Sequence, residues 1–368
     1  MFDDYYGSLR KRDLEMTLCE ECQDTADAHL AAERETEPSA LPEMPLLPIT
    51  SPETVKACQS LTVTERDIFV CSYPKSGTTW TQNLVVRLLA AQVGMELPTD
   101  WHLSHSAPFY EVDQYWTKSS NGDNSNSAAT TTLKRVPAKT PIQSSDGTAY
   151  RVFNTHLRPH QLPPNAKYVY VMRDPMDVLV SFYHHLSNQT EADGGYSGTA
   201  KEFCQDFLNG TVLYGKWEDH LEAWLGRYYQ KSNATKEDKN IMLLHYEEMK
   251  QDLKQEATRL AKFLDVPDEE LESIVNTALS HCTFDAMKTE RWRYTPQSVS
   301  WKVDPKTGKP YDRFVREGRI GDGKEFMEKI FTSDLKEQWI KNADRARRRW
   351  RDAGIDMEVD RYLGRRRS

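Results

Sequence analysis

Short apolar runs alternate with amphipathic stretches through most of the chain. The runs are short enough to be buried strands, and they lie at residues 66–73, 149–156, 166–174 and 240–246. Between them, apolar residues recur every three or four positions, which is typical of helices that bury one face. These stretches are residues 78–94, 175–188, 199–210 and 217–230. Strands that alternate with helices predict an α/β fold, with a central parallel sheet flanked by helices.

The pattern also predicts how the domain is delimited. We expect a partly ordered arm at residues 1–45, a single domain at 46–355 and a basic tail at 356–368, because both ends are charged and lack apolar periodicity. Inside the domain, residues 117–132 are polar and of low complexity, which is typical of a disordered surface insertion. Residues 291–324 are basic, aromatic and rich in Gly and Pro, which predicts a long functional loop.

Composition excludes several classes of protein. The 368 residues carry a net charge of −8, and a non-specific nucleic-acid-binding protein needs a positive face instead. No run approaches the roughly 20 apolar residues of a membrane span. The N-terminus shows no secretory signal, so we expect a cytoplasmic protein. Cys19 and Cys22 form a lone CxxC pair, and we expect reduced thiols and no bound metal.

One loop has the parts of a phosphate-binding site in an unusual order. The stretch CSYPKSGTTW, residues 71–80, joins a predicted strand to a predicted helix. In a Walker loop the lysine follows the last glycine, whereas Lys75 precedes Gly77 here, and Ser72 occupies the place of the first glycine. The helix start offers free N–H groups and the positive end of its dipole. The loop therefore predicts an anion site that differs from that of a nucleoside triphosphatase.

Three further stretches place polar side chains near strand ends. They are NTHLRP (154–159), YVMRDPMDVLVS (170–181) and RFVREGRIGDGK (313–324). The carboxyl ends of parallel strands line the ligand crevice of an α/β sheet. Taken singly, these residues have structural interpretations too: His156 as a histidine after a strand, and Arg173 as part of an ion pair at a helix start.

Together, the stretches YPKSGTTW, RDPMDVLVSFYH and REGRIGDGK resemble the signature segments of the cytosolic sulfotransferases, in the same order, within a similarity that runs from about residue 45 to 340. The resemblance implies a P-loop-like nucleotide-binding fold. It also implies transfer of a sulfuryl group from 3′-phosphoadenosine-5′-phosphosulfate (PAPS) to a hydroxyl or amine of a small molecule, leaving 3′-phosphoadenosine-5′-phosphate (PAP), without a metal.

The resemblance further implies a role for individual residues. His156 matches the general base that takes the proton of the acceptor, and Lys75 matches the group that neutralises charge on the bridging oxygen of the donor. The expected donor-binding residues are Lys75, Ser76, Gly77, Thr78, Thr79, Trp80, Arg173, Ser181, Tyr246, Cys282, Phe284, Arg316, Glu317 and Gly318. The expected acceptor pocket comprises Trp101, His105, Phe109, Tyr110, Asn154 and Tyr214. A homodimer through residues 329–337 is left open, because this stretch matches the dimerisation segment of the family only in part.

The sequence departs from the family pattern near the reacting groups. Asn154 stands where the family usually has a lysine, so we expect weaker stabilisation of the donor sulfate, unless another cation compensates. The candidates for that cation are Lys134, Lys139 and Arg158. Glu317 replaces a lysine in the loop expected to close over the 3′-phosphate, and Cys282 replaces a threonine near the adenine.

Two other functions compete with sulfuryl transfer. A P-loop kinase is disfavoured by the order of Lys75 and Gly77, and by the strand 240–246, which ends in Tyr246 and shows no clear Walker-B aspartate. A non-catalytic or weakly active nucleotide-binding module is favoured by the departures at Asn154 and Glu317.

Overall fold

The structure is a computed structural model, and it divides into two compact units. One unit spans Met44–Asn342, and the other contains residues 343–363 together with residues 41–43. The described residues are 41–119, 132–232, 240–311, 314–315 and 318–363. The arm boundary at residue 45 and the domain boundary at residue 355 stay predictions.

A five-stranded sheet forms the centre of the larger unit, in the order β4-β5-β1-β6-β7. Neighbouring strands run parallel except for β4, which is an antiparallel edge strand. The strands are β1 Asp67–Ser72, β4 Ile142–Gln143, β5 Ala149–Thr155, β6 Lys167–Met172 and β7 Ile241–His245. The predicted α/β fold with a mainly parallel sheet is confirmed. The central strands read as continuous apolar runs because both of their faces are buried.

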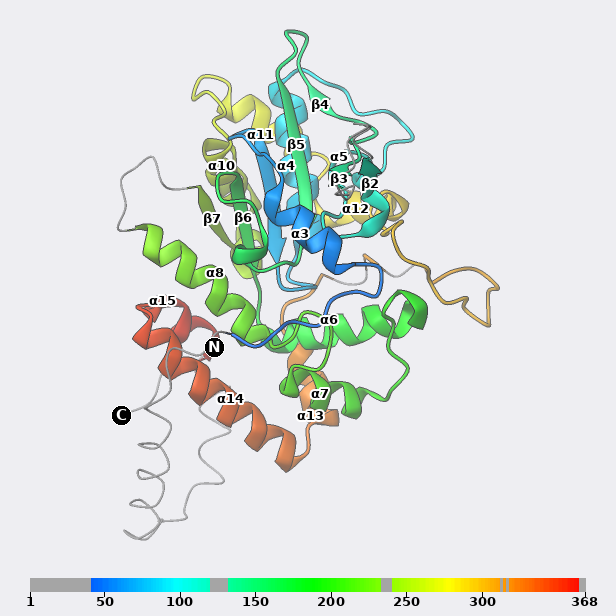
Figure 1. The fold of residues 1–368 in the computed structure, drawn as a ribbon, viewed down its shortest axis with the longest axis vertical. Coiled ribbons are helices and arrows are strands. Elements are labelled where there is room, and N and C mark those ends of the chain that lie inside the picture. Colours follow the sequence, from blue (N-terminus) through cyan, green and yellow to red (C-terminus); the bar gives the residue numbers. More distant parts are fainter. Residues whose placement is uncertain (1–40, 120–131, 233–239, 312–313, 316–317, 364–368) are drawn as a thin grey trace, which may run out of the picture. The chain divides into compact units, whose positions relative to one another are not determined.

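Helices cover both faces of this sheet (Figure 1). On one face, Ile68 and Val70 of β1 share a core with α4, α10 and α11. On the other face, Trp224 of α8 stacks on Tyr170 of β6, with ring centroids 4.9 Å apart. The helices of the larger unit include α3 Pro52–Ser60, α4 Thr78–Gln92, α5 Leu103–Ser106, α6 Pro175–Asn188, α7 Ala200–Asn209, α8 Trp217–Ser232, α9 Tyr246–Gln251, α10 Leu253–Phe263, α11 Leu271–Leu279, α12 Phe284–Thr289 and α13 Asp322–Ile330.

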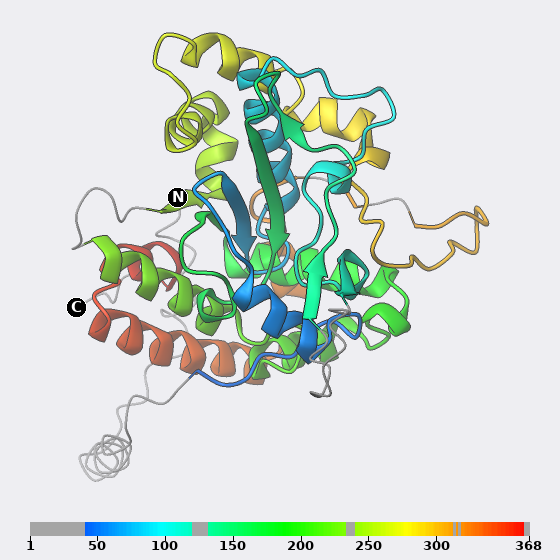
Figure 2. The same ribbon diagram turned by 45° about the horizontal axis from the view of Figure 1, so that its top comes forward.

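The carboxyl ends of the parallel strands point toward α6. Figure 2 shows the arrowheads of β1 and β5 directed the same way, to the side where α6 lies in Figure 1. Helix α6 starts where the sequence predicts it: Pro175 is its first residue, and the Asp174 side chain caps it by accepting from the N–H of Met176 at 2.8 Å. This start places Arg173 at the end of β6.

The flanks of the predicted insertion at residues 117–132 are ordered. Strands β2 (Trp116–Ser119) and β3 (Thr132–Arg135) pair in an antiparallel ladder. The Trp116 indole and the Arg135 guanidinium both donate to the Tyr110 carbonyl, at 2.7 and 2.8 Å, and tie the hairpin to the domain. The prediction of disorder is therefore wrong for these flanks. Residues 120–131 lie outside the described residues.

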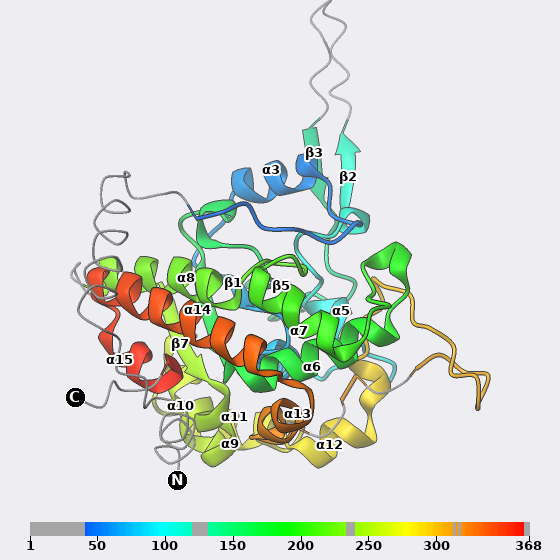
Figure 3. The same ribbon diagram turned by 90° about the horizontal axis from the view of Figure 1, so that it is seen from below.

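The long loop at residues 291–324 is tied to distant parts of the domain. The Arg293 guanidinium donates to the Trp101 carbonyl (2.7 Å), and the Lys302 N–H donates to the Asn188 carbonyl (2.8 Å). The loop also contains a short helical turn, η6 Arg291–Arg293, and its last residues begin α13, which packs against α6 (Figure 3). It is a loop with fixed attachment points.

The C-terminal unit is helical by itself. Helix α14 (Ser333–Asp352) continues into this unit, followed by α15 (Asp356–Glu358) and η7 (Val359–Leu363). Arg347 pairs with Asp344 and donates to the Leu363 carbonyl. Most of the predicted basic tail at 356–368 is thus helical as far as it is described. None of the helices in the described ranges is long and apolar enough to span a membrane.

Candidate functional site

The loop between β1 and α4 has an unusual backbone. Lys75 has a φ of 69° and Gly77 a φ of 108°, both in the left-handed region that non-glycine residues rarely adopt. The N–H of Ser76 donates to the Tyr73 carbonyl at 3.3 Å and tightens the turn. Gly77 is the N-cap of α4 and contributes no side-chain cap, so the N–H groups of the first turn face the loop. This is the backbone arrangement of an anion site.

Aromatic rings press against two glycines of the site. A Cβ on Gly77 would lie 2.8 Å from a ring carbon of Tyr246, and one on Gly318 would lie 2.7 Å from a ring carbon of Phe284. Trp80 lies edge-on to Tyr246, with centroids 5.6 Å apart, and its indole N–H donates to the Cys282 carbonyl at 2.7 Å. The rings of Trp80, Tyr246 and Phe284 therefore form aromatic walls beside the anion loop.

Arg173 joins the anion loop to the segment before α13. Its guanidinium donates to the carbonyls of Lys75 (3.3 Å) and Arg319 (2.9 Å) and lies 3.6 Å from a carboxylate oxygen of Asp177. The buried Nε has no hydrogen-bond partner among the residues that the structure describes. Arg173 thus keeps a donor available inside the site.

Asp177 of α6 holds the segment at residues 318–323, called the closing segment here because the sequence predicts that it closes over the 3′-phosphate. Its two carboxylate oxygens accept from the N–H groups of Gly321 (2.9 Å) and Gly323 (2.8 Å) at the start of α13. A carboxylate is favourable at a helix N-terminus because of the helix dipole. One side chain therefore positions both Arg173 and the start of α13.

His156 follows β5 and is held by hydrogen bonds from three directions. Its Nδ1 donates to the Ser72 carbonyl at 2.8 Å, so in the neutral ring Nε2 carries no proton and can accept one. Its backbone N–H donates to a Glu111 carboxylate oxygen (2.8 Å), and its carbonyl accepts from His220 Nε2 (2.9 Å). The ring lies edge-on to Phe109 and Tyr214, with centroids 5.4 and 5.1 Å away.

Burial changes the acid–base behaviour of this region. It lowers the pKa of His156 to about 4, opposed by the bond to the Ser72 carbonyl and reinforced by the Lys75 ammonium. The pKa of His156 thus lies well below the ordinary histidine value of about 6.5. Burial also raises the pKa of Glu111 to about 7, although the His156 N–H and the Tyr214 hydroxyl donate to it.

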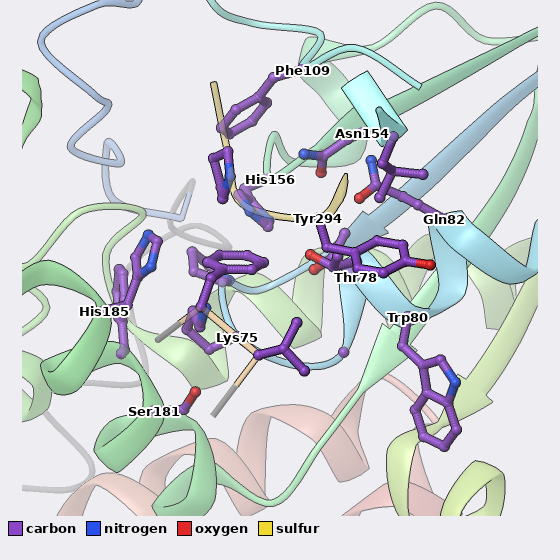
Figure 4. A pocket seen from close by; sticks show the side chains of 18 of the residues that line it. Lys75, Thr78, Trp80, Gln82, Phe109, Asn154, His156, Ser181, His185 and Tyr294 are labelled. Carbon is purple, nitrogen blue, oxygen red and sulfur yellow. The ribbon is translucent and has the colours of Figure 1, made fainter. Parts of the chain in front are cut away.

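The anion loop, the aromatic walls, Arg173 and His156 line one cavity of about 240 Å³ (Figure 4). It joins the anion loop, the aromatic walls and His156, which come from the ends of β1, β5 and β6 and from the segments after β7. The sequence-predicted residues that line it are Lys75, Gly77, Thr78, Thr79, Trp80, Phe109, Asn154, His156, Arg173, Ser181, Tyr214, Tyr246, Phe284 and Gly318.

Three residues predicted for the acceptor pocket do not line the cavity. Trp101 and Tyr110 are buried in the core, where the indole N–H of Trp101 donates to Ser106 at 2.9 Å and the Tyr110 hydroxyl donates to the Cys58 carbonyl at 2.9 Å. The ring of His105 accepts from the N–H of His102 at 3.3 Å and caps α5. Trp101 and Tyr110 thus satisfy the polar atoms of their side chains within the core.

Two residues predicted for donor binding also lie outside the lining. Ser76 is fully buried, and its hydroxyl has no hydrogen-bond partner within the described ranges. Cys282 is buried too, and only its carbonyl takes part in the site, by orienting Trp80. Arg316 and Glu317 fall outside the described residues.

The cavity contains residues that the sequence did not single out. Lys250 lies on α9, one turn after Tyr246, with its ammonium 6.0 Å from the Trp80 ring and 5.6 Å from the Phe284 ring. Phe314 lies against Lys75, whose ammonium is 4.1 Å from the ring centroid. Further unpredicted lining residues include Gln82, His185, Gln189 and Tyr294. Helical spacing from a predicted residue could have found Lys250 and His185.

Asn154 lies in the cavity wall, without a compensating cation from the three candidates. Its side-chain oxygen is buried without a hydrogen-bond partner among the described residues. Of the cations proposed to compensate, Lys134 and Lys139 are exposed and Arg158 is buried in the core, and none of them lines the cavity.

Comparison with known proteins gives one consistent match. Residues 65–343 match the family described as the Sulfotransferase domain. The amine sulfotransferase of the rabbit Oryctolagus cuniculus is 29% identical over 294 residues, which cover 75% of this chain and 82% of that protein. Sulfotransferase 1E1 of the mouse Mus musculus is 30% identical over 286 residues, which cover 74% of this chain and 83% of that protein.

Solved structures share the fold. A mouse sulfotransferase, SULT7A1, in complex with PAP aligns with a TM-score of 0.53 at 21% identity, over 86% of this chain and 95% of that one. Retinol dehydratase in complex with androsterone and PAP aligns with a TM-score of 0.51 at 21% identity, over 83% of this chain and 86% of that one.

Proposed function

The chain belongs to the sulfotransferase family, and on this premise we propose that it transfers the sulfuryl group of PAPS to a hydroxyl of a small acceptor. One observation carries the proposal: a single cavity brings the Lys75 loop, Arg173 and the unprotonated Nε2 of His156 together. The two relatives in complex with PAP support the choice of donor.

The cavity fits the two anionic ends of this donor. The loop from Lys75 to Thr79 offers backbone N–H groups and hydroxyls to the 5′-phosphosulfate. The unpartnered Nε of Arg173 and the hydroxyl of Ser181 suit the 3′-phosphate. The rings of Trp80 and Phe284 suit a flat base between these ends, because aromatic faces stack on planar groups. The donor supplies the sulfuryl group and leaves as PAP.

His156 would act as the general base. Its Nε2 would take the hydroxyl proton as the acceptor oxygen bonds to sulfur and the bond from sulfur to the bridging oxygen breaks. The Ser72 carbonyl holds the tautomer that makes this step feasible, and the Glu111 carboxyl fixes the backbone of His156. Lys75 would stabilise the negative charge that develops on the bridging oxygen.

The replacement of His156 by Ala tests this assignment. We expect transfer from radiolabelled PAPS to fall by at least about a thousandfold, within the range of general-base effects. PAP affinity, measured by calorimetry, should stay within about twofold, because the contacts expected for PAP come from other side chains. The acceptor panel should hold phenols, alcohols, sugars and amines, since one relative is an amine sulfotransferase. Near-normal turnover of the variant would refute His156 as the base.

A nucleotide-binding module of low activity is the second candidate, and Asn154 favours it. The side chain brings no charge to the cavity wall where the family has a lysine, and none of the three candidate cations replaces it. PAP binding without transfer to any acceptor would favour this candidate. Stronger binding of ATP with Mg²⁺ than of PAP would indicate a kinase instead. A cytoplasmic location and a homodimer stay predictions.

A further inference from the structure

One face of α6, together with the C-cap residue that follows the helix, contributes a polar stripe to the cavity. Ser181, His185 and Gln189 follow one another at intervals of four residues, and all three line the cavity. Ser181 lies at the end proposed for the 3′-phosphate. The stripe therefore runs from the donor end toward the remainder of the cavity, and the mechanism proposed above uses only its first member.

His185 is the titratable member of this stripe. Its ring lies edge-on to Trp301 and Phe314, with centroids 5.3 and 5.6 Å away. It makes no hydrogen bond to any residue in the described part of the chain, and it faces the cavity. Burial holds the pKa of His185 well below its ordinary value, and the nearby Lys75 ammonium and His156 act in the same direction. The ring is thus neutral, with one donor and one acceptor nitrogen.

His185 lies in the part of the cavity that also holds the groups proposed to react. Figure 4 shows it on the side of the cavity where Lys75, Ser181 and His156 lie, and away from Trp80. The Phe314 ring contacts both the Lys75 ammonium and the His185 imidazole. Because His156 and His185 line the same cavity, a small molecule with its hydroxyl at His156 can extend another polar group to His185.

We propose that His185 selects acceptors that carry a second, uncharged hydrogen-bonding group, such as a hydroxyl or an amide, in addition to the hydroxyl that reacts. This inference rests on the proposed function. An acceptor that lacks the second group would enclose the imidazole nitrogens without partners, and unpaired polar groups of this kind penalise binding. A cationic group is disfavoured because the Lys75 ammonium acts on the same space.

The test compares matched ligands on the PAP-saturated protein. Para-hydroxyethylphenol and para-ethylphenol differ by one hydroxyl, and calorimetry gives their affinities without any need for turnover. For the wild type we expect about tenfold tighter binding of the hydroxyethyl compound, which is the value of one good hydrogen bond. In His185→Phe this preference should fall to about one, and in His185→Asn, which keeps a donor and an acceptor, part of it should remain.

His184→Phe is the matched control, because His184 is the exposed neighbour on the same helix and does not line the cavity. It should keep the full preference. An unchanged preference in His185→Phe would overturn the inference, and so would a wild type that binds both compounds equally or neither. Failure of PAP to bind the wild type would instead overturn the proposed function, and the inference with it.

Discussion

At the scale of single residues, the proposed chemistry depends on a histidine that burial keeps neutral. Because the pKa of His156 is about 4, the proposed base is unprotonated across the neutral range, and it becomes protonated only as the pH falls through that value. We expect kcat/KM for a neutral acceptor to stay level from roughly pH 8 to 6 and to show no loss centred near the ordinary histidine pKa of about 6.5. A pH–rate profile with a limb at that value would contradict the assigned environment of His156.

Asn154 offers a gain of function as a test. Asn154→Lys would restore a cation at the cavity wall, where the buried amide oxygen now lacks a partner among the described residues. We expect kcat to rise about tenfold, because the added charge stabilises the transferring group in the transition state, while PAP affinity changes little. Asn154→Met is the control, because methionine is similar in length to lysine but carries no charge. This variant should show no rise in kcat. If both variants are equally active, the charge at this position is not limiting.

Glu111 links the site to stability. Its pKa is raised from 4.5 to about 7 in the fold. The protonated carboxyl therefore contributes to the free energy of unfolding fully below the unfolded-state pKa of 4.5, and this contribution is lost as the pH rises through about 7. At about 1.4 kcal/mol per pKa unit, the wild type should lose a few kcal/mol more than Glu111→Gln between those pH values. Denaturant unfolding at several pH values measures this difference. Glu269→Gln, at an exposed position, should behave like the wild type.

At the scale of elements, α6 organises the site through its first turn. Asp177 binds the start of α13 and lies beside Arg173, so it connects the closing segment to the anion site. We expect Asp177→Ala to lower PAP affinity about tenfold and to lower the melting temperature, because two backbone N–H groups lose their acceptor. Asp285→Ala, at an exposed site in the first turn of α12, is the control. Unchanged PAP affinity in Asp177→Ala would show that the closing segment is held by other contacts.

The main elements could be predicted from the sequence, but the short strands and the long-range attachments could not. The apolar pattern located the parallel strands β1, β5, β6 and β7 and helix α6, since period and caps are local properties, and it missed β4 and the β2–β3 hairpin. The attachment of residues 291–324 depends on partners such as Asn188, more than a hundred positions away in the chain. Aromatic residues were the second difficulty: Trp101 and Tyr110 look like pocket walls in sequence, yet packing decides whether such a ring lines a cavity or fills the core.

At the scale of the whole molecule, the larger unit assembles one cavity from segments that are far apart in the sequence. PAP should therefore protect residues 75–80 together with residues 314–315 and 318–324 from hydrogen exchange, because binding favours the conformation in which these segments contact the cavity. At a concentration of about 100 times Kd, PAP should stabilise the protein by about 2.7 kcal/mol. Protection confined to one of the two segments would contradict a shared binding site.

The contact between Phe314 and Lys75 has a kinetic consequence. Phe314 lies against the ammonium proposed to serve the donor and against His185 on the acceptor side, so one ring borders both half-sites. In the proposed reaction, the donor would draw the Lys75 ammonium away from the Phe314 ring and so change the acceptor wall. We therefore expect an ordered sequence of binding, with the donor entering first and PAP leaving last.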